Sequence, residues 1–182
     1  RHLTPQLRRI DEPSRLLLLD LGDGANRLGG SCLAQVYRRY GGRAPDVDSA
    51  ERIADFVSAI HALAEAGIAL AYHDRSDGGL LATVCEMMFA GRQGASITLV
   101  GSEEDVLAQL FSEELGAVIQ VAESRLDEAE RILEQCGTSW TELGKVEADD
   151  QLTIYGDDEV LIRLDRTRLQ RAWSETSWRM QA

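Results

Sequence analysis

The sequence predicts an α+β fold, a mixed sheet between layers of helices in an α/β/α arrangement. Short apolar segments of strand length alternate with amphipathic segments of helical period along the 182 residues. The chain then closes on two strand-like segments, 151–155 and 159–164, separated by the turn signal GDD at 156–158. Neither an internal repeat nor a low-complexity tract interrupts this order. We therefore expect an extended, charged N-terminal segment at 1–14 and a single domain at 15–182.

The first elements follow from apolar runs and the residues that flank them. RLLLLDL (15–21) predicts a short buried strand, and the glycine-rich loop GDGANRLGG ends it. Ser31 can cap a helix over 32–40. Asp48 and Glu51 resemble a capping box that opens a longer helix, which Gly67 ends. The apolar stripe of this helix is Ile53, Phe56, Val57, Ile60, Leu63 and Ala64.

The second half continues in the same way. IALAYH (68–73) predicts a buried strand, and LLATVCEMMFA (80–90), with Glu86 as its one charge, predicts a buried helix. Further strands are predicted at 95–100, 117–122, 141–146, 151–155 and 159–164. Further helices are predicted at about 103–114, 125–136 and 166–178.

Composition excludes several classes of protein. The formal net charge is −12, which disfavours nucleic acid and anionic membranes as partners, while backbone N–H groups and a divalent cation can still hold one nucleotide phosphate. Cys32, Cys85 and Cys136 are isolated in apolar stretches, as reduced thiols of a cytoplasmic protein are. No apolar run reaches the length of a membrane span. Because the chain starts at Arg1 and not at Met, we expect a part of a longer polypeptide, and since no basic-then-apolar leader follows, we expect no secretory signal.

The most polar loop, HDRSDGG (73–79), is the strongest candidate site. It joins the end of a buried strand to the start of a buried helix, where glycines allow close approach and free N–H groups attract phosphate. A carboxylate such as Asp74 or Asp77 can ligate Mg²⁺, and the hydroxyl of Ser76 can contact a phosphate or the metal. Each residue also has a structural interpretation: Asp77 as helix N-cap, His73 as a donor at the strand end, and Ser76 as a turn residue.

Weaker signals lie elsewhere. RLGGS (27–31) places Arg27 near an anion-sized opening, but a glycine turn with Ser31 as cap is the favoured interpretation. Glu113 and Glu114 come at a helix end, which indicates a partner contact or solvated surface, and we favour the solvated surface. Glu86 needs a partner in its buried helix, for which we expect a local backbone donor or a surface-reaching conformation. Leu169 and Trp173, four residues apart, point to the core.

Four segments carry a resemblance to a known family. These are LDLGDGANRLGGSCLAQVYRRYG, AYHDRSDGGLLATVCEMMFAGRQG, LFSEELGAVIQV and WSETSWRMQ. From about residue 4 to the end, the chain resembles the large, single-chain form of phosphoribosylformylglycinamidine synthase, at the second of its two C-terminal-type synthetase domains. The resemblance implies the fold of the aminoimidazole ribonucleotide synthetase C-terminal domain.

The resemblance also implies a function. The family converts formylglycinamide ribonucleotide, glutamine and ATP into formylglycinamidine ribonucleotide, glutamate, ADP and phosphate in purine biosynthesis. By motif position, Asp74 matches a magnesium ligand and Ser76 a nucleotide contact at an auxiliary Mg²⁺–ADP site. No catalytic residue is carried over. The implied partners are the preceding synthetase domains, which hold the rest of the site, and the following glutaminase domain.

Two other hypotheses stay open. The HD-x-SDGGL motif alone occurs across the wider superfamily, which includes selenophosphate synthetase and thiamine monophosphate kinase. A free-standing nucleotide-binding protein of that kind is the alternative enzyme. A non-catalytic assembly module, whose sheet and Trp-bearing C-terminal helix pack against neighbouring domains, is the third hypothesis.

Overall fold

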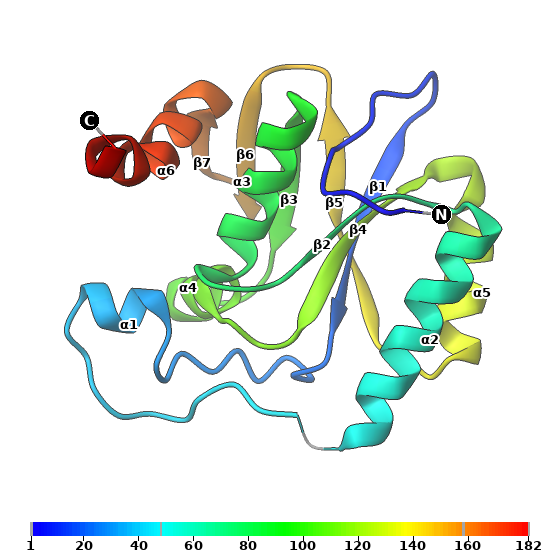
Figure 1. Cartoon of the computed structure of the whole chain (residues 1–182), viewed down its shortest axis with the longest axis horizontal. Helices are drawn as coiled ribbons and strands as arrows, with labels where there is room; N and C mark the ends of the chain where they lie inside the picture. Colours follow the sequence, from blue (N-terminus) through cyan, green and yellow to red (C-terminus); the bar gives the residue numbers. More distant parts are fainter. Residues whose placement is uncertain (1, 48, 158, 182) are drawn as a thin grey trace.

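The computed structural model describes residues 2–47, 49–157 and 159–181, which form seven strands, six α-helices and one 3₁₀ turn (Figure 1). The strands are β1 (Ser14–Asp20), β2 (Ala69–Asp74), β3 (Gly94–Leu99), β4 (Gly116–Ala122), β5 (Trp140–Glu147), β6 (Gln151–Gly156) and β7 (Glu159–Asp165). The helices are α1 (Cys32–Val36), α2 (Ala50–Ala66), α3 (Gly79–Gly91), α4 (Glu103–Phe111), α5 (Leu126–Gln135) and α6 (Arg166–Gln181), with the 3₁₀ turn η1 at Glu123–Arg125. Among the described residues, no helix is both long and apolar enough to cross a membrane.

All seven strands join one mixed sheet in the order β2-β4-β1-β5-β3-β6-β7. Every neighbouring pair is antiparallel except β3 and β6, which run parallel. The predicted closing hairpin is confirmed, since β6 and β7 pair antiparallel from Gln151 opposite Asp165 to Gly156 opposite Glu159. Asp158, part of its predicted turn signal, lies outside the described residues.

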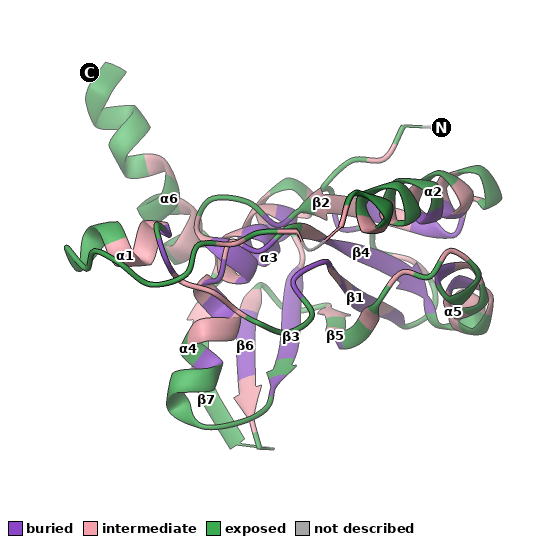
Figure 2. Cartoon of the chain, turned by 90° about the horizontal axis from the view of Figure 1, so that it is seen from below, coloured by how far each residue is buried: buried purple, intermediate pink, exposed green. Residues whose placement is uncertain are grey.

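Alternation along β1 divides the core into two halves. Leu16 packs with α3 and α4 on one face, whereas Leu17 and Leu19 pack with α2 and α5 on the other. Figure 2 shows the buried residues concentrated on the strands and on the inner sides of the helices. The predicted α+β fold with helices on both faces of a mixed sheet is confirmed. The layer of α2 and α5 is partial, because the same face of β5, β3 and β6 carries polar side chains around a shallow 340 Å³ depression.

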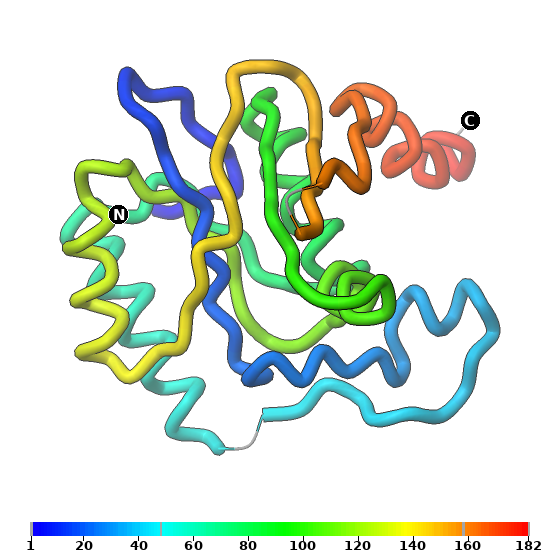
Figure 3. Tube along the Cα trace, turned by 180° about the vertical axis from the view of Figure 1, so that it is seen from behind, coloured from blue at the N-terminus to red at the C-terminus, as the bar shows by residue number. Residues whose placement is uncertain are grey.

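The N-terminal segment contributes to this core. Leu7 is 1% exposed, and its backbone N–H donates to the carbonyl of Met87 on α3. Gly91 lies so close to Leu7 that a Cβ atom there would come within 2.3 Å of the Leu7 carbonyl oxygen. From this segment the chain enters β1, and Figure 3 shows that it ends in α6 on the opposite side of the molecule.

All predicted strands and helices exist, but two predicted helices are too long. α1 ends at Val36 instead of residue 40, because Arg38 adopts a left-handed φ of 51°. α4 ends at Phe111 instead of 114, because Ser112 is extended and carries the next two residues away from the helix axis. The last helix, α6, runs beyond the predicted 178 to Gln181.

The start of α2 and its apolar stripe also differ from the prediction. Ser49 is the N-cap and accepts a hydrogen bond from the Arg52 N–H, whereas Asp48 lies outside the described residues. The fully buried side chains of α2 are Ala59 and Leu63, while Ile53 is 43% exposed. Val57 is equally exposed, so two of the six residues of the predicted stripe face solvent, while Ala59 and Leu63 pack in the cluster formed with β1, β2, β4 and α5.

Candidate functional site

The loop at 73–79 turns the chain from β2 into α3. Gly78 is the N-cap of α3 with φ 85°, a conformation that glycine adopts without strain, so the expectation of Asp77 as N-cap is wrong. Gly79 follows with φ 69°, and a Cβ atom there would lie 2.7 Å from the backbone of Phe111 and Ser112. The two glycines therefore allow the start of α3 to pack directly on the end of α4.

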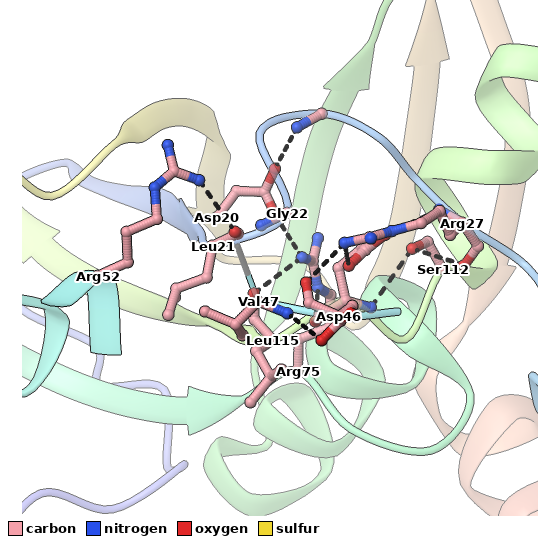
Figure 4. Close-up of polar contacts among 12 residues, drawn as sticks. Asp20, Leu21, Gly22, Arg27, Asp46, Val47, Arg52, Arg75, Ser112 and Leu115 are labelled. Carbon is pink, nitrogen blue, oxygen red and sulfur yellow. Dashed lines mark hydrogen bonds and ion pairs between the residues drawn. The ribbon is translucent and has the colours of Figure 1, made fainter. Parts of the chain in front are cut away.

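Arg75, which we did not single out from the sequence, anchors this loop. Its side chain is 1% exposed and forms an ion pair with Asp20 at the end of β1 (Figure 4). Its Nε donates to the carbonyl of Glu114 at 2.5 Å and its Nη2 to that of Leu115 at 3.1 Å. Its backbone N–H donates to the carbonyl of Gly116, where β4 begins. The loop is thus fixed to the ends of β1 and β4 by one buried guanidinium.

Glu114 is fully buried, so the expectation of a solvated surface position is wrong. Its carboxylate accepts hydrogen bonds from Nε of Arg27 at 2.5 Å and from Nη2 at 2.8 Å. Arg27 also donates to the carbonyl of Asp46 at 2.6 Å. The Arg27 side chain is 9% exposed, which means that the motif at 27–31 holds a structural ion pair. Ser31 is the N-cap of α1, as predicted.

Glu113 is also not a solvated surface residue, because it joins two loops. Its Oε1 accepts from the N–H of Cys32 at 2.8 Å and from the N–H of Gly78 at 2.9 Å. We expected free N–H groups at the start of α3, but Glu113 binds that of Gly78, and the carbonyl of Ser76 binds that of Gly79 at 2.9 Å. A carboxylate of the chain itself thus takes a place that a phosphate could take.

The segments at 27–32, 73–79 and 110–116 therefore meet at one point. Cys32 Sγ and the carboxylates of Asp77 and Glu113 offer atoms that all lie within 4.8 Å of one another, a group that could hold a metal ion. Burial raises the pKa of the Cys32 thiol, and the hydrogen bond and charge of Glu113 and the charge of Asp77 raise it further. The thiol stays protonated at neutral pH, so oxygen donors dominate the cluster.

The two residues predicted to bind ligand, Asp74 and Ser76, are both exposed, on either side of buried Arg75. Asp74 is the last residue of β2, and its carboxylate accepts a hydrogen bond from the hydroxyl of Tyr72. Burial and the Asp74 carboxylate raise the pKa of Tyr72, which keeps the phenol neutral. The side chain of Ser76 is exposed, and its carbonyl closes the turn onto Gly79. The carboxylate of Asp74 and the hydroxyl of Ser76 are therefore both accessible from solvent.

His73 and Glu86 connect the loop to α6. Nε2 of His73 lies 2.8 Å from Oε2 of Glu86, and because a carboxylate only accepts, this nitrogen is the donor. Nε1 of Trp173 donates to Oε1 of Glu86 at 2.8 Å, and the Trp173 ring lies 5.8 Å from that of Phe89. His73 is thus a structural donor, as expected. The partners of Glu86 are two distant side chains and not a local backbone donor, and its carboxylate is 29% exposed, in part as expected for a surface-reaching conformation. Trp173 is 58% exposed rather than a core residue, and Leu169 is partly buried.

Sequence reasoning missed Arg75 and the inward positions of Glu113 and Glu114. A signal for the first existed: an arginine between two aspartates directly after a buried strand lies where it needs an acidic partner. No local pattern could show that Asp20, 55 residues earlier, supplies it. The glutamates follow a helix, and only the tertiary packing of α4 against α3 turns them inward.

Comparisons with known proteins agree with this fold. The family described as "AIR synthase related protein, C-terminal domain" matches residues 14–157. The solved structure of Thermotoga maritima PurL complexed with ATP has a TM-score of 0.70 at 12% identity, covering 92% of this chain and 27% of that one. Escherichia coli HypE, a hydrogenase maturation protein, has a TM-score of 0.59 at 18% identity, covering 90% of this chain and 51% of that one. Thiamine-monophosphate kinase from Stenotrophomonas maltophilia has a TM-score of 0.54 at 17% identity, covering 86% of this chain and 53% of that one. The chain thus spans about a quarter of PurL.

The first prediction concerns Glu86, which holds both His73 and Trp173. Glu86→Ala removes the acceptor of both N–H groups, and because these groups are partly exposed to water we expect the free energy of unfolding to fall by about 0.5–1.5 kcal/mol. Urea unfolding followed by circular dichroism measures the change. The control is Glu175→Ala, which removes only an exposed i,i+4 ion pair with Arg179 and should cost less than about 0.5 kcal/mol. Equal losses in both variants would contradict the role of Glu86.

The second prediction concerns the Cys32 thiol. In Glu113→Gln the charge that raises its pKa is gone, so a larger fraction is thiolate at a given pH. We expect Cys32 to be alkylated by iodoacetamide at mildly alkaline pH faster by about twofold or more. Mass spectrometry measures the rate, with Cys85 as internal reference, since burial raises its pKa to about 12. Glu104→Gln, an exposed neutralisation on α4, should leave the rate unchanged, and a slower or unaltered rate in Glu113→Gln would contradict the prediction.

Proposed function

Because the chain belongs to the AIR synthase related family, of which it contains the C-terminal domain, we propose that it is one domain of a phosphoribosylformylglycinamidine synthase of the large, single-chain type. The motifs of the sequence support this assignment, and the fold agrees with that of PurL at a TM-score of 0.70. The reaction of the complete enzyme would be the ATP- and glutamine-dependent conversion of formylglycinamide ribonucleotide to formylglycinamidine ribonucleotide. Structures of T. maritima PurL are known with ATP, with ADP and with FGAR.

The contribution of this domain would be part of an auxiliary Mg²⁺–nucleotide site at the loop 73–79. The observation that carries this proposal is the anchoring of the loop by buried Arg75, which fixes the backbone on both sides of it while Asp74 and Ser76 stay exposed. A site of this kind needs groups that are held in place before the ligand arrives.

The residues present fit a magnesium ion. Mg²⁺ prefers carboxylate oxygens, and Asp74 offers a carboxylate whose side-chain partner, the neutral Tyr72 hydroxyl, does not cancel its charge. A bound Mg²⁺ would neutralise phosphate charge. Ser76 would donate its hydroxyl hydrogen to a phosphate oxygen, and Tyr72 would orient the Asp74 carboxylate. Arg27 would take no part, because Glu114 already binds it.

The proposed site is incomplete within this chain. The chain would contribute one carboxylate ligand and one hydroxyl, whereas Mg²⁺ requires near-octahedral coordination. We propose that preceding synthetase domains supply the remaining ligands and most nucleotide contacts, and that a glutaminase domain supplies ammonia. Neither Cys85 nor Cys32 is suited to act as a nucleophile, because burial raises the pKa of the Cys85 thiol to about 12 and also raises that of Cys32.

A free-standing kinase or synthetase of the same superfamily is the second candidate. The similarity to thiamine-monophosphate kinase, with a TM-score of 0.54, and to HypE, with 0.59, favours it. We rank it second because the PurL fold agrees more closely and because the segments LFSEELGAVIQV and WSETSWRMQ resemble the amidotransferase.

The third prediction tests Asp74 in the complete enzyme. Asp74→Asn removes the charge of the proposed magnesium ligand, and we expect the purified enzyme to retain less nucleotide and to melt at a lower temperature, with a smaller change in ammonia transfer. Nucleotide released by acid is quantified by chromatography, and Tm by calorimetry. Asp11→Asn, an exposed carboxylate of the N-terminal segment, is the control and should change neither quantity. Wild-type nucleotide content and Tm in Asp74→Asn would overturn the metal assignment.

The fourth prediction tests whether the site is only partial. We expect the 182-residue chain alone to bind Mg–ADP weakly or not at all, since the other ligands would lie in a preceding domain. Isothermal titration calorimetry measures the affinity, with magnesium omitted in the control titration. Tight, saturable, magnesium-dependent binding would favour the free-standing alternative instead.

A further inference from the structure

Three side chains on one face of α3 reach from the loop 73–79 to α6. Thr83, Glu86 and Phe89 are spaced three residues apart, and residues at this spacing are neighbours on the surface of an α-helix. Thr83 contacts the loop, Phe89 contacts α6, and Glu86, which lies between them, contacts both β2 and α6. Figure 1 shows α6 beside α3, with which it is in contact. α3 therefore connects the end of β2 with the last helix.

The end of β2 is held from α3 at two consecutive residues. β2 lies at the edge of the sheet, beside β4, so its end relies on contacts from outside the sheet. Oγ1 of Thr83, a residue that is 1% exposed, shares its hydrogen between the carbonyls of Asp74 at 3.2 Å and Gly79 at 3.1 Å. Nε2 of His73 donates to Oε2 of Glu86 at 2.8 Å. Thr83 and Glu86 thus fix the backbone from which the Asp74 carboxylate projects.

Each oxygen of the Glu86 carboxylate has a different partner. Oε2 accepts from His73, and Oε1 accepts from Nε1 of Trp173 at 2.8 Å. The last torsion of a glutamate side chain is broad, so the carboxylate plane has no strong orientation of its own. A donor held on Oε1 therefore fixes the direction in which Oε2 points. Because the Glu86 and His73 side chains are 29% and 21% exposed, water can replace the Trp173 donor, but a mobile water molecule fixes this orientation less well.

α6 is attached to the rest of the molecule through few buried contacts. None of its described residues is fully buried, and Trp178 and Met180 are 69% and 82% exposed. Leu169 is partly buried against the core, and the Trp173 ring, one turn later, lies 5.8 Å from that of Phe89 at an angle of 58°. An element with few buried contacts moves at a low free-energy cost. The hydrogen bond from Trp173 to Glu86 is therefore sensitive to the position of α6.

We propose that Glu86 is a positioning residue for the loop 73–79, and that its hydrogen bond with Trp173 makes metal and nucleotide binding at Asp74 depend on the position of α6. This inference rests on the proposed function, because it requires that Asp74 holds a ligand. The indole N–H orients Glu86, Glu86 orients His73, and His73 precedes Asp74 directly in β2. Coupling of this kind is reciprocal, so a ligand at Asp74 favours the docked position of α6 by the same factor.

The fifth prediction isolates the indole N–H of Trp173. Trp173→Phe keeps an aromatic ring beside Phe89 but removes the donor to Oε1 of Glu86. In the complete enzyme we expect EDTA to release the retained nucleotide about three- to tenfold faster than from the wild type, because Asp74 is less well positioned to hold the metal. Chromatography of the released ADP measures the rate. Trp178→Phe, the same substitution at a 69% exposed position of α6, is the matched control and should leave the rate unchanged.

Two further measurements separate positioning from a general loss of stability. In an Asp74→Asn background reloaded with ADP and magnesium, Trp173→Phe should change the release rate by less than about twofold, because residues that act through one another are non-additive. With fluorotryptophan incorporated, the fluorine resonance of Trp173, identified by its absence in Trp173→Phe, should shift when nucleotide and magnesium are removed. The Trp178 resonance should not move. A purely structural role for Trp173 predicts neither result.

The outcomes distinguish this inference from the proposed function. If Asp74→Asn itself leaves nucleotide release unchanged, the proposed site fails and the inference fails with it. If Asp74→Asn accelerates release while Trp173→Phe does not, or while both tryptophan variants accelerate it equally, only the role of Glu86 and Trp173 is overturned. An equal effect of Trp173→Phe in the wild-type and Asp74→Asn backgrounds would also overturn that role, as would a Trp173 resonance that does not respond to the ligand.

Discussion

The ends of three strands depend on one buried cation, the guanidinium of Arg75. Removing such a group from water costs several kcal/mol unless a charge and further acceptors compensate it. Asp20 supplies the charge, and the carbonyls of Glu114 and Leu115 supply acceptors. Because these partners belong to the end of β1 and the approach to β4, Arg75 fixes β2, β1 and β4 at the edge from which the loop 73–79 extends. The shape of the loop is therefore a property of the sheet and not of the loop residues alone.

The adjacent residues Glu113 and Glu114 bind different parts of the structure around this loop. Glu114 points inward and binds Arg27, which holds the glycine-rich segment before α1. Glu113 binds the backbone N–H groups of Cys32 and Gly78 and so connects the starts of α1 and α3. Neighbouring residues in an extended chain point in opposite directions, which explains how consecutive glutamates reach different partners. Replacing Glu114 would leave the buried Arg27 without its carboxylate, whereas replacing Glu113 would remove the link between the starts of α1 and α3.

The sequence predicted the existence, type and order of the elements because each is marked locally, by an apolar run, a period, a cap or a glycine. It also located the loop 73–79 and the structural roles of Ser31 and His73. It failed where the decisive partner is distant in the chain: Arg75 with Asp20, Arg27 with Glu114, and Glu86 with Trp173. The predicted ends of α1 and α4 were wrong for a related reason. The left-handed φ of Arg38 and the extended conformation of Ser112 are imposed by the path that the next residues take through the fold. The charge of a residue does not by itself indicate whether its side chain is solvated or forms an ion pair.

The charges at the loop determine how a ligand could be held there. Both nearby buried cations, Arg75 and Arg27, are already paired with Asp20 and Glu114. Asp74, Asp77 and Glu113 remain, and the neutral phenol of Tyr72 leaves the charge of Asp74 intact. A phosphate would meet net negative charge, and the N–H of Gly78 is already bound. If the proposed function holds, a divalent cation must therefore bind before or together with the nucleotide. The affinity for nucleotide should then depend less on ionic strength than on magnesium concentration, because the metal contact is direct and little screened.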